Sequence, residues 1–309
     1  MPGFGTPAGQ SGEPPAVRAA RKRTRDTTRL AKRVRVKQEG RAEDDGYRCE
    51  LVPGLRASGD AERLAEEIGF ASGRLLALGA SPPRLYADAR ELDDFEQAAW
   101  MCFLAVYLSP LEDDDPFAAI RTALQSDWRA GELPDLEQTR LGPRTSHDPA
   151  RGADTLRAYL QWAKRAGSQE QALTGDAEWT SERRFERIFE RLTFPGFGRM
   201  GRYELLVTLG RLGMYELTPD SLHIAAAAGP GAAAANDHTP AAAKRIFAIG
   251  DPLSIERRAV ALAGALSVPL AALDLALANW GASERATLGI PAGAFDVHAH
   301  ERAQVELEL

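Results

Sequence analysis

The residues whose types and spacing best suit chemistry lie between Phe194 and Ile224. This stretch opens with FPGFG, in which Pro195, Gly196 and Gly198 favour a tight turn. Glycine adopts backbone angles closed to other residues and lets the main chain approach a ligand closely. A turn of this kind that leads into a helix presents backbone N–H groups outward, which suits a phosphate. The sequence therefore predicts an anion-binding hairpin.

Basic residues accompany the hairpin on both sides. Arginines occur at positions 183, 184, 187, 191, 199, 202 and 211. Arginine binds phosphate through several N–H groups at once. We therefore predict that the hairpin binds a nucleic-acid backbone through Pro195, Gly196, Phe197, Gly198, Arg199 and Arg202. An ordinary tight turn between two helices is the alternative, because the pattern PGxG alone fits both.

Two acids and a histidine are the candidates for proton transfer. Asp220, in TPDSLHI, is the first choice for an acid/base residue, and His223 follows three residues later. Asp251, in IGDP, is the second choice. Each has a structural alternative, because Asp beside proline often caps a helix and a lone histidine is more often structural. The sequence leaves both interpretations open.

The hairpin resembles the helix-hairpin-helix of base-excision DNA glycosylases, which reads LPGVG and precedes a catalytic aspartate in a V-D-T-H stretch. Asp220 lies close to the place of that aspartate, displaced by two residues. Met200 stands where the bifunctional members carry a Schiff-base lysine. The resemblance therefore implies no amine catalysis from that position and no strand-cleaving lyase step.

A closer resemblance is carried by four spaced blocks. They are DDFEQAAWMCFLAVYLSPLEDDDPF from Asp93, FPGFGRMGRYELL from Phe194, RIFAIGDPLSIERRA from Arg245 and LDLALANW from Leu273. These blocks resemble the α-glutamyl/putrescinyl-thymine pyrophosphorylase family, a divergent branch of the helix-hairpin-helix glycosylase superfamily. The similarity spans roughly residues 58 to 280.

This resemblance implies a substitution at a hypermodified thymine in DNA. The pyrophosphate of 5-pyrophosphoryloxymethyluracil is replaced by an amine, from an amino acid or putrescine, after the base is flipped out. Asp220 would deprotonate or orient the amine, and Arg257 and Arg258 would neutralise pyrophosphate unless they are solvated face residues. The partners are DNA and the amine, and neither a cofactor nor a metal is expected.

Two other functions fit the same residues. A monofunctional DNA glycosylase would use Asp220 to stabilise an oxocarbenium ion. A non-enzymatic module would only hold the DNA backbone, with strongly salt-dependent binding and no product. The sequence ranks these behind the amine transfer and excludes neither.

The elements that must position these residues are predicted to be helices. Aromatic residues make up only 7% of the chain, and apolar residues recur at helical rather than alternating spacing. Helices are expected from about 60, at 91–108, 154–166 and 180–192, from about 199, and at 240–249, 254–267 and 269–279. The segment 91–108 is apolar on every face, which predicts a buried helix.

The predicted fold is therefore all-α, a helix-hairpin-helix DNA-glycosylase-like domain. It occupies residues 58–285, with the hairpin motif at about 181–215. Residues 1–45 are expected to be a disordered basic tail, 225–235 a mobile loop and 286–309 a C-terminal tail.

Charge is divided unevenly along the chain. Residues 18–37 hold ten Lys or Arg and one acid, so the rest is more acidic than the net charge of −6 suggests. A basic arm on an acidic body favours a polyanionic partner for the arm, although a solvated tail is the alternative. The chain lacks an apolar run long enough for a membrane, and the two cysteines have no metal-binding spacing. We expect a cytoplasmic protein, associated with a nucleoid or with a phage-infected cell.

Overall fold

The computed structural model describes residues 42–228, 236–291 and 294–309, and all regular structure within them is helical. The prediction of an all-α fold is confirmed. Most of the expected basic tail and the second half of the expected loop lie outside the described residues. The α-helices are α1 (Ser58–Ala80), α2 (Arg84–Glu91), α3 (Phe95–Leu108), α4 (Ala118–Ala123), α5 (Asp154–Ala166), α6 (Gln169–Thr174), α7 (Ser181–Arg191), α8 (Arg199–Arg211), α9 (Thr239–Phe247), α10 (Pro252–Leu266), α11 (Leu270–Gly281) and α12 (Val297–Glu306).

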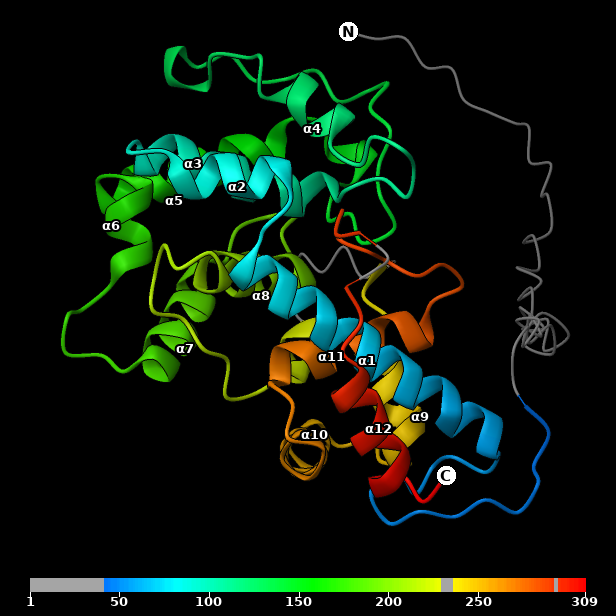
Figure 1. The fold of residues 1–309 in the computed structure, drawn as a ribbon. Coiled ribbons are helices and arrows are strands. Elements are labelled where there is room, and N and C mark those ends of the chain that lie inside the picture. Colours follow the sequence, from blue (N-terminus) through cyan, green and yellow to red (C-terminus); the bar gives the residue numbers. More distant parts are fainter. Residues whose placement is uncertain (1–41, 229–235, 292–293) are drawn as a thin grey trace, which may run out of the picture. The chain divides into compact units, whose positions relative to one another are not determined.

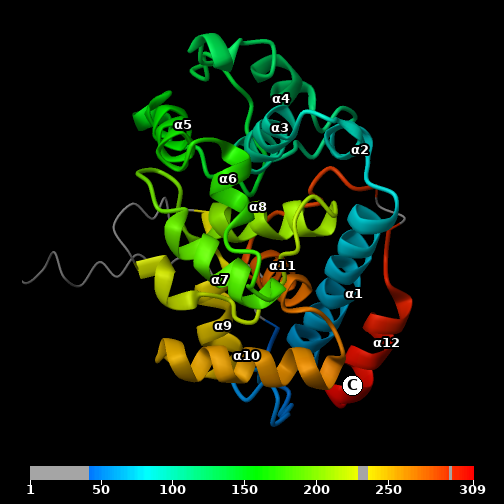
Figure 2. The ribbon, with the colours of Figure 1, turned by 90° about the vertical axis from the view of Figure 1, so that its left-hand side faces the viewer.

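Helix α8 lies between two groups of helices (Figures 1 and 2). One group contains α2 to α6. The other brings the two ends of the described chain together, because α1 packs on α11 and α12 while α9 and α10 pack on α11. Helix α8 contacts α3 in the first group and α1 in the second. Helix α8 thus joins the two groups.

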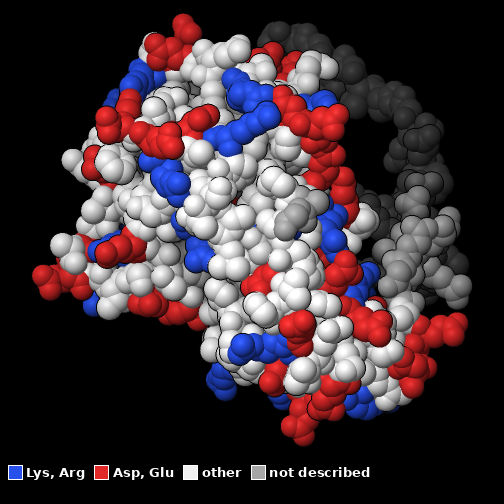
Figure 3. Space-filling view, in the orientation of Figure 1, with Lys and Arg blue, Asp and Glu red and all other residues white. Residues whose placement is uncertain are grey.

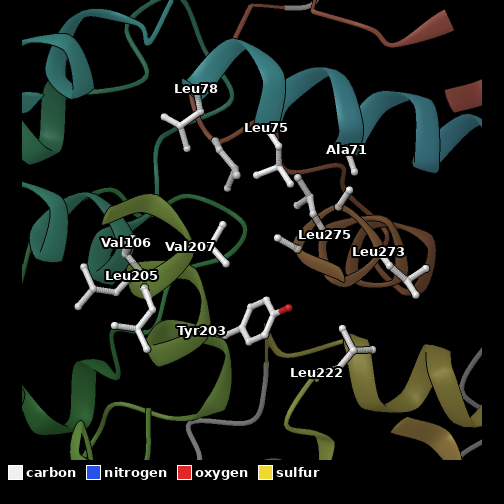
Figure 4. Packing of buried hydrophobic residues seen from close by; sticks show 14 of the residues in the cluster. Ala71, Leu75, Leu78, Val106, Tyr203, Leu205, Val207, Leu222, Leu273 and Leu275 are labelled. Carbon is white, nitrogen blue, oxygen red and sulfur yellow. The ribbon is translucent and has the colours of Figure 1, made fainter. Parts of the chain in front are cut away.

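Helix α3 confirms the expectation of a buried helix, since every residue from Ala98 to Leu108 is buried. Figure 4 shows how α8 shares its apolar faces. Val106 of α3 lies beside Leu205 of α8, and Val207 of α8 faces Leu75 of α1. Burying a side chain of this size contributes about 1.5–3 kcal/mol, so these contacts fix α8 firmly.

Most predicted helix boundaries agree with the structure to within a few residues. Helix α7 begins after Thr180, whose side chain accepts a hydrogen bond from the Arg183 amide. The short helices α2 and α6 were not predicted. Helix α4 begins without a side-chain cap.

The structure of the C-terminal segment differs from the prediction. Residues 286–309 were expected to be a tail, yet they contain α12, which packs against α1 and α10. Ala299, Ala303 and Leu307 are buried at a spacing of four residues. This apolar stripe is narrow and made mostly of alanine, so its signal is weak in the sequence.

Two apolar helices follow one another near the end of the chain. Within the described ranges, no single helix is long and apolar enough to cross a membrane. Helices α10 and α11 reach the required length only together, and they are bent by 108° at their junction.

Candidate functional site

A turn at Pro195 and Gly196 connects α7 to α8, at the place where the sequence predicts a tight turn. We call residues 194–198 the hairpin. Gly196 has φ +84°, and a Cβ atom there would lie 2.0 Å from the Thr155 hydroxyl oxygen, so only glycine fits. Phe194 and Phe197 are buried and stack with ring centres 5.1 Å apart. Pro195 is exposed. The turn is therefore anchored from inside by aromatic packing while its tip meets solvent.

The need for glycine at position 196 gives a stability prediction. Gly196→Ala is expected to lower the free energy of unfolding by about 2–3 kcal/mol, because left-handed strain and the clash with Thr155 add together. Urea unfolding at pH 7 measures this change. Gly213→Ala is the matched control, since Gly213 has φ +73° with no atom within 4 Å of its would-be Cβ. A loss no larger than that of the control would contradict the clash.

The first turn of α8 has free backbone amides. Gly198 is the N-cap residue, has no side chain to cap the helix and is half-exposed. The first hydrogen bond of the helix runs from the Arg202 amide to the Gly198 carbonyl oxygen. The amides of Gly198 and Arg199 have no acceptor among the described residues. This end of α8 is therefore suited to an anion.

The two arginines of the predicted DNA contact face the interior. Arg199 is only 1% exposed and donates to both carboxylate oxygens of Asp237, at 2.7 and 2.8 Å. Arg202 donates to the Phe189 carbonyl oxygen and the Thr193 hydroxyl, at 3.3 and 3.2 Å. These guanidinium groups hold the hairpin in place. Their contact with DNA stays a prediction.

A second buried arginine completes a network of charges below the hairpin. Arg144 donates to Glu204 at 2.7 Å and to Asp274 at 3.1 Å. Asp274 also accepts from Arg199 at 2.8 Å. We call these five residues the buried charge cluster: Arg144, Arg199, Glu204, Asp237 and Asp274. The cluster joins the loop before α5, helix α8, the segment before α9 and helix α11.

Burial and pairing set the proton affinities within this cluster. Burial raises the pKa of Glu204, although Arg144 opposes it. Burial also acts to raise the pKa of Asp237, but Arg199 outweighs that effect and leaves the pKa below its ordinary value. For Arg199, Asp274 and Asp237 overcome the desolvation and raise the pKa. Asp237 is therefore an ionised partner of Arg199 at neutral pH.

The segment that carries Asp220 and His223 is clamped from two sides. Arg199 donates to the Leu222 carbonyl oxygen at 2.7 Å. On the other side, the Glu256 carboxylate of α10 accepts from the amides of Leu222 and Ile224, at 2.7 and 2.5 Å. The residue between these amides, His223, has φ +53°, a conformation that costs energy for most side chains. We refer to these contacts as the Arg199–Glu256 clamp.

The clamp places Asp220 and His223 in different surroundings. Asp220 is exposed and has no hydrogen bond or ion pair within the described ranges. The His223 ring stacks on Phe189 with centres 3.9 Å apart, and its Nε2 is buried without a partner. Burial, with Arg199 and Arg202 nearby, lowers the pKa of His223 to about 4. Asp220 is thus an exposed carboxylate without a hydrogen-bond partner, whereas His223 is buried and neutral at pH 7.

The lowered pKa of His223 predicts how stability depends on pH. Below pH 6.5 the unfolded chain protonates this histidine while the folded chain does not, so stability falls as the pH drops towards 4. Between pH 7 and pH 5 we expect His223 to account for a loss of about 1–2 kcal/mol. In urea unfolding, the His223→Asn variant should not show this loss of unfolding free energy between pH 7 and pH 5. The variant should fold, because asparagine tolerates positive φ. His298→Asn, at a 94% exposed side chain, is the control. Equal pH profiles for the wild type and His223→Asn would contradict the prediction.

The structure does not bring the remaining predicted residues to this site. Asp251 caps α10, where its carboxylate accepts from the Ser254 amide at 2.8 Å. Arg257 and Arg258 are exposed on α10, and Arg258 donates to the Glu50 carbonyl oxygen. Neither arginine contacts the hairpin, the clamp or the buried charge cluster within the described ranges.

Sequence reasoning missed four members of the cluster: Arg144, Glu204, Asp237 and Asp274. Glu204 and Asp274 carried a usable signal, because each is a lone acid inside an apolar stretch, YELLV and LDLAL. A charge in such a position is rarely buried without a partner. Arg144 and Asp237 lie in irregular segments and give no comparable signal. Among the residues that the structure describes, no group of three or more His, Cys, Asp or Glu is placed to hold a metal ion.

Charges on the surface are mixed. On the face shown in Figure 3, basic side chains lie in small groups among acidic ones. A nucleic acid that contacts this face would meet local anion sites instead of a broad basic area.

Residues 143–287 match the family model described as alpha-glutamyl/putrescinyl thymine pyrophosphorylase clade 3. No curated protein and no solved structure matches the chain. The resemblance inferred from the sequence is confirmed for this part of the chain, whereas its first block, residues 93–117, lies outside the match. The matched segment contains the hairpin, the Arg199–Glu256 clamp and every member of the buried charge cluster.

Proposed function

With the family match over residues 143–287 as the premise, we propose that this chain replaces the pyrophosphate of 5-pyrophosphoryloxymethyluracil in DNA with an amine. One observation carries the proposal. The hairpin, the clamp and the buried charge cluster come from distant parts of the matched segment, and Arg199 at the start of α8 connects all three. Arg199 therefore ties the predicted DNA-binding turn to the segment that carries Asp220.

DNA binding is assigned to the tip of the hairpin. The free amide of the half-exposed Gly198, at the positive end of α8, binds a backbone phosphate. Such contacts position the duplex and carry no sequence information. Flipping the modified base out costs a few kcal/mol, which backbone contacts of this kind offset.

The chemical step is assigned to the exposed carboxylate beside the clamp. The amine nitrogen attacks the methylene carbon of the base, and the bond from that carbon to the pyrophosphate oxygen breaks. The pyrophosphate leaves with the bonding electron pair, and Asp220 accepts the proton that the nitrogen loses. The clamp fixes the backbone on the C-terminal side of Asp220, so the carboxylate is presented from a rigid segment.

The reaction products test this function. The purified chain is incubated with an oligonucleotide that contains 5-pyrophosphoryloxymethyluracil and with single amines, among them putrescine and glutamate. The mass of the DNA and the released pyrophosphate are then measured. The proposal expects DNA that gains the amine and loses one pyrophosphate per modified base. Abasic sites would support the glycosylase instead, and binding without any product would support the DNA-binding module.

A further inference from the structure

A cavity of about 210 Å³ lies at the opposite end of α8 from the hairpin. Its walls come from α1, the end of α8, the turn between α10 and α11, and the first turns of α12. Arg211 on its wall is twelve residues beyond Arg199, which is about 18 Å along a helix. The cavity is therefore a separate feature from the site proposed above.

Two arginines line this cavity, and neither has a carboxylate partner among the described residues. Arg211 is half-buried, and its Nε is fully buried without a hydrogen-bond acceptor. Arg302 donates only to the hydroxyl of Ser267, at 2.8 Å. A partly buried guanidinium without an acceptor is costly, and an oxyanion is the group that satisfies it best.

The other polar groups of the wall leave this positive charge in place. Ser72 is only 4% exposed, and its hydroxyl has no partner. The one acidic side chain among the lining residues, Asp296, already accepts a hydrogen bond from the Ala299 amide and caps α12. The wall thus holds two cationic groups and an unpaired hydroxyl against one carboxylate, so its positive groups outnumber the negative one.

We propose that this cavity binds a phosphate-type oxyanion between Arg211 and Arg302. The proposal goes beyond the reaction at the hairpin and does not depend on it. The same chemistry fits a free anion, such as phosphate or pyrophosphate, and a phosphate group of the DNA backbone. Arginine recognises both through paired N–H donors.

Calorimetric titration at fixed ionic strength tests the site. The full chain is titrated with sodium phosphate, with sodium pyrophosphate and with a short unmodified duplex. Arg211→Gln and Arg302→Gln are each expected to weaken binding of the true ligand by about tenfold or more. Arg302 is exposed, so its variant should fold even if removal of Arg211 disturbs the structure. Arg165→Gln, at an exposed arginine of α5, is the matched control and should bind as the wild type does.

The three titrations distinguish a site for a free anion from a site for the DNA backbone. Tight binding of free phosphate or pyrophosphate that is lost in both cavity variants supports a small-anion site. Binding of the duplex alone, with the same losses, assigns the cavity to the DNA backbone. Either no binding of any probe, or binding that Arg302→Gln and Arg165→Gln leave equally strong, would overturn the proposal. Because no turnover is measured, failure of the amine transfer would not affect this result.

Discussion

Replacing Asp274 with alanine is expected to lower the free energy of unfolding by about 3–5 kcal/mol. Asp274 is 2% exposed and accepts hydrogen bonds from both Arg144 and Arg199. Its removal leaves two buried guanidinium groups with only Glu204 and Asp237 as charged partners. A buried charge that loses its partner cannot regain the hydration it gave up on folding.

Urea unfolding at pH 7, followed by circular dichroism, measures this loss. Asp274→Asn should lose less, because the amide oxygen still accepts one hydrogen bond. Glu190→Gln serves as the surface control, since Glu190 pairs with Arg187 at 3.1 Å and both are about half exposed. That change should cost less than about 1 kcal/mol. A loss from Asp274→Ala as small as that of the control would mean that the cluster does not hold the fold together.

The second large effect concerns the reaction. Asp220→Asn is expected to slow the transfer of the amine by about 10²–10⁴-fold, which is the usual contribution of a general base. The asparagine side chain matches aspartate in size but does not accept a proton. Asp220 is exposed and makes no hydrogen bond or ion pair within the described ranges, so the stability of the fold should change little.

Single-turnover rates on the pyrophosphorylated oligonucleotide measure the effect. Asp251→Asn is the matched control, because asparagine caps a helix about as well as aspartate does and Asp251 is engaged at the start of α10. Its rate should equal that of the wild type. If Asp220→Asn reacted as fast as the wild type, the base would have to be another residue.

The helices could be predicted from the sequence because their signals are local. Apolar spacing and start signals such as Thr180 depend on residues within one or two turns. The hairpin was predictable for the same reason, since two glycines within four residues mark it. Helix α12 was missed because its buried stripe is made of small residues and its charges resemble those of a solvated tail.

The buried charge cluster could not be predicted, because its pairs join distant parts of the chain. Arg144 is 60 residues from Glu204 and 130 residues from Asp274. Arg199 illustrates the consequence. Its position beside the hairpin indicated a phosphate contact, but only the fold shows that Asp237 and Asp274 surround its guanidinium group. The sequence shows where charged residues lie along the chain. It does not show which of them become ion-pair partners in the folded protein.

Hydrogen exchange of the wild type with and without the pyrophosphorylated oligonucleotide tests most directly that the first turn of α8 receives the substrate. Mass spectrometry of peptides gives the exchange of each segment, and fluorescence anisotropy reports how much DNA is bound. With the DNA saturating, residues 195–201 are predicted to exchange more slowly, because phosphate oxygens would accept from amides that are free in the protein alone. Full binding with unchanged exchange in residues 195–201 would contradict the account and move the nucleic-acid contact to another surface.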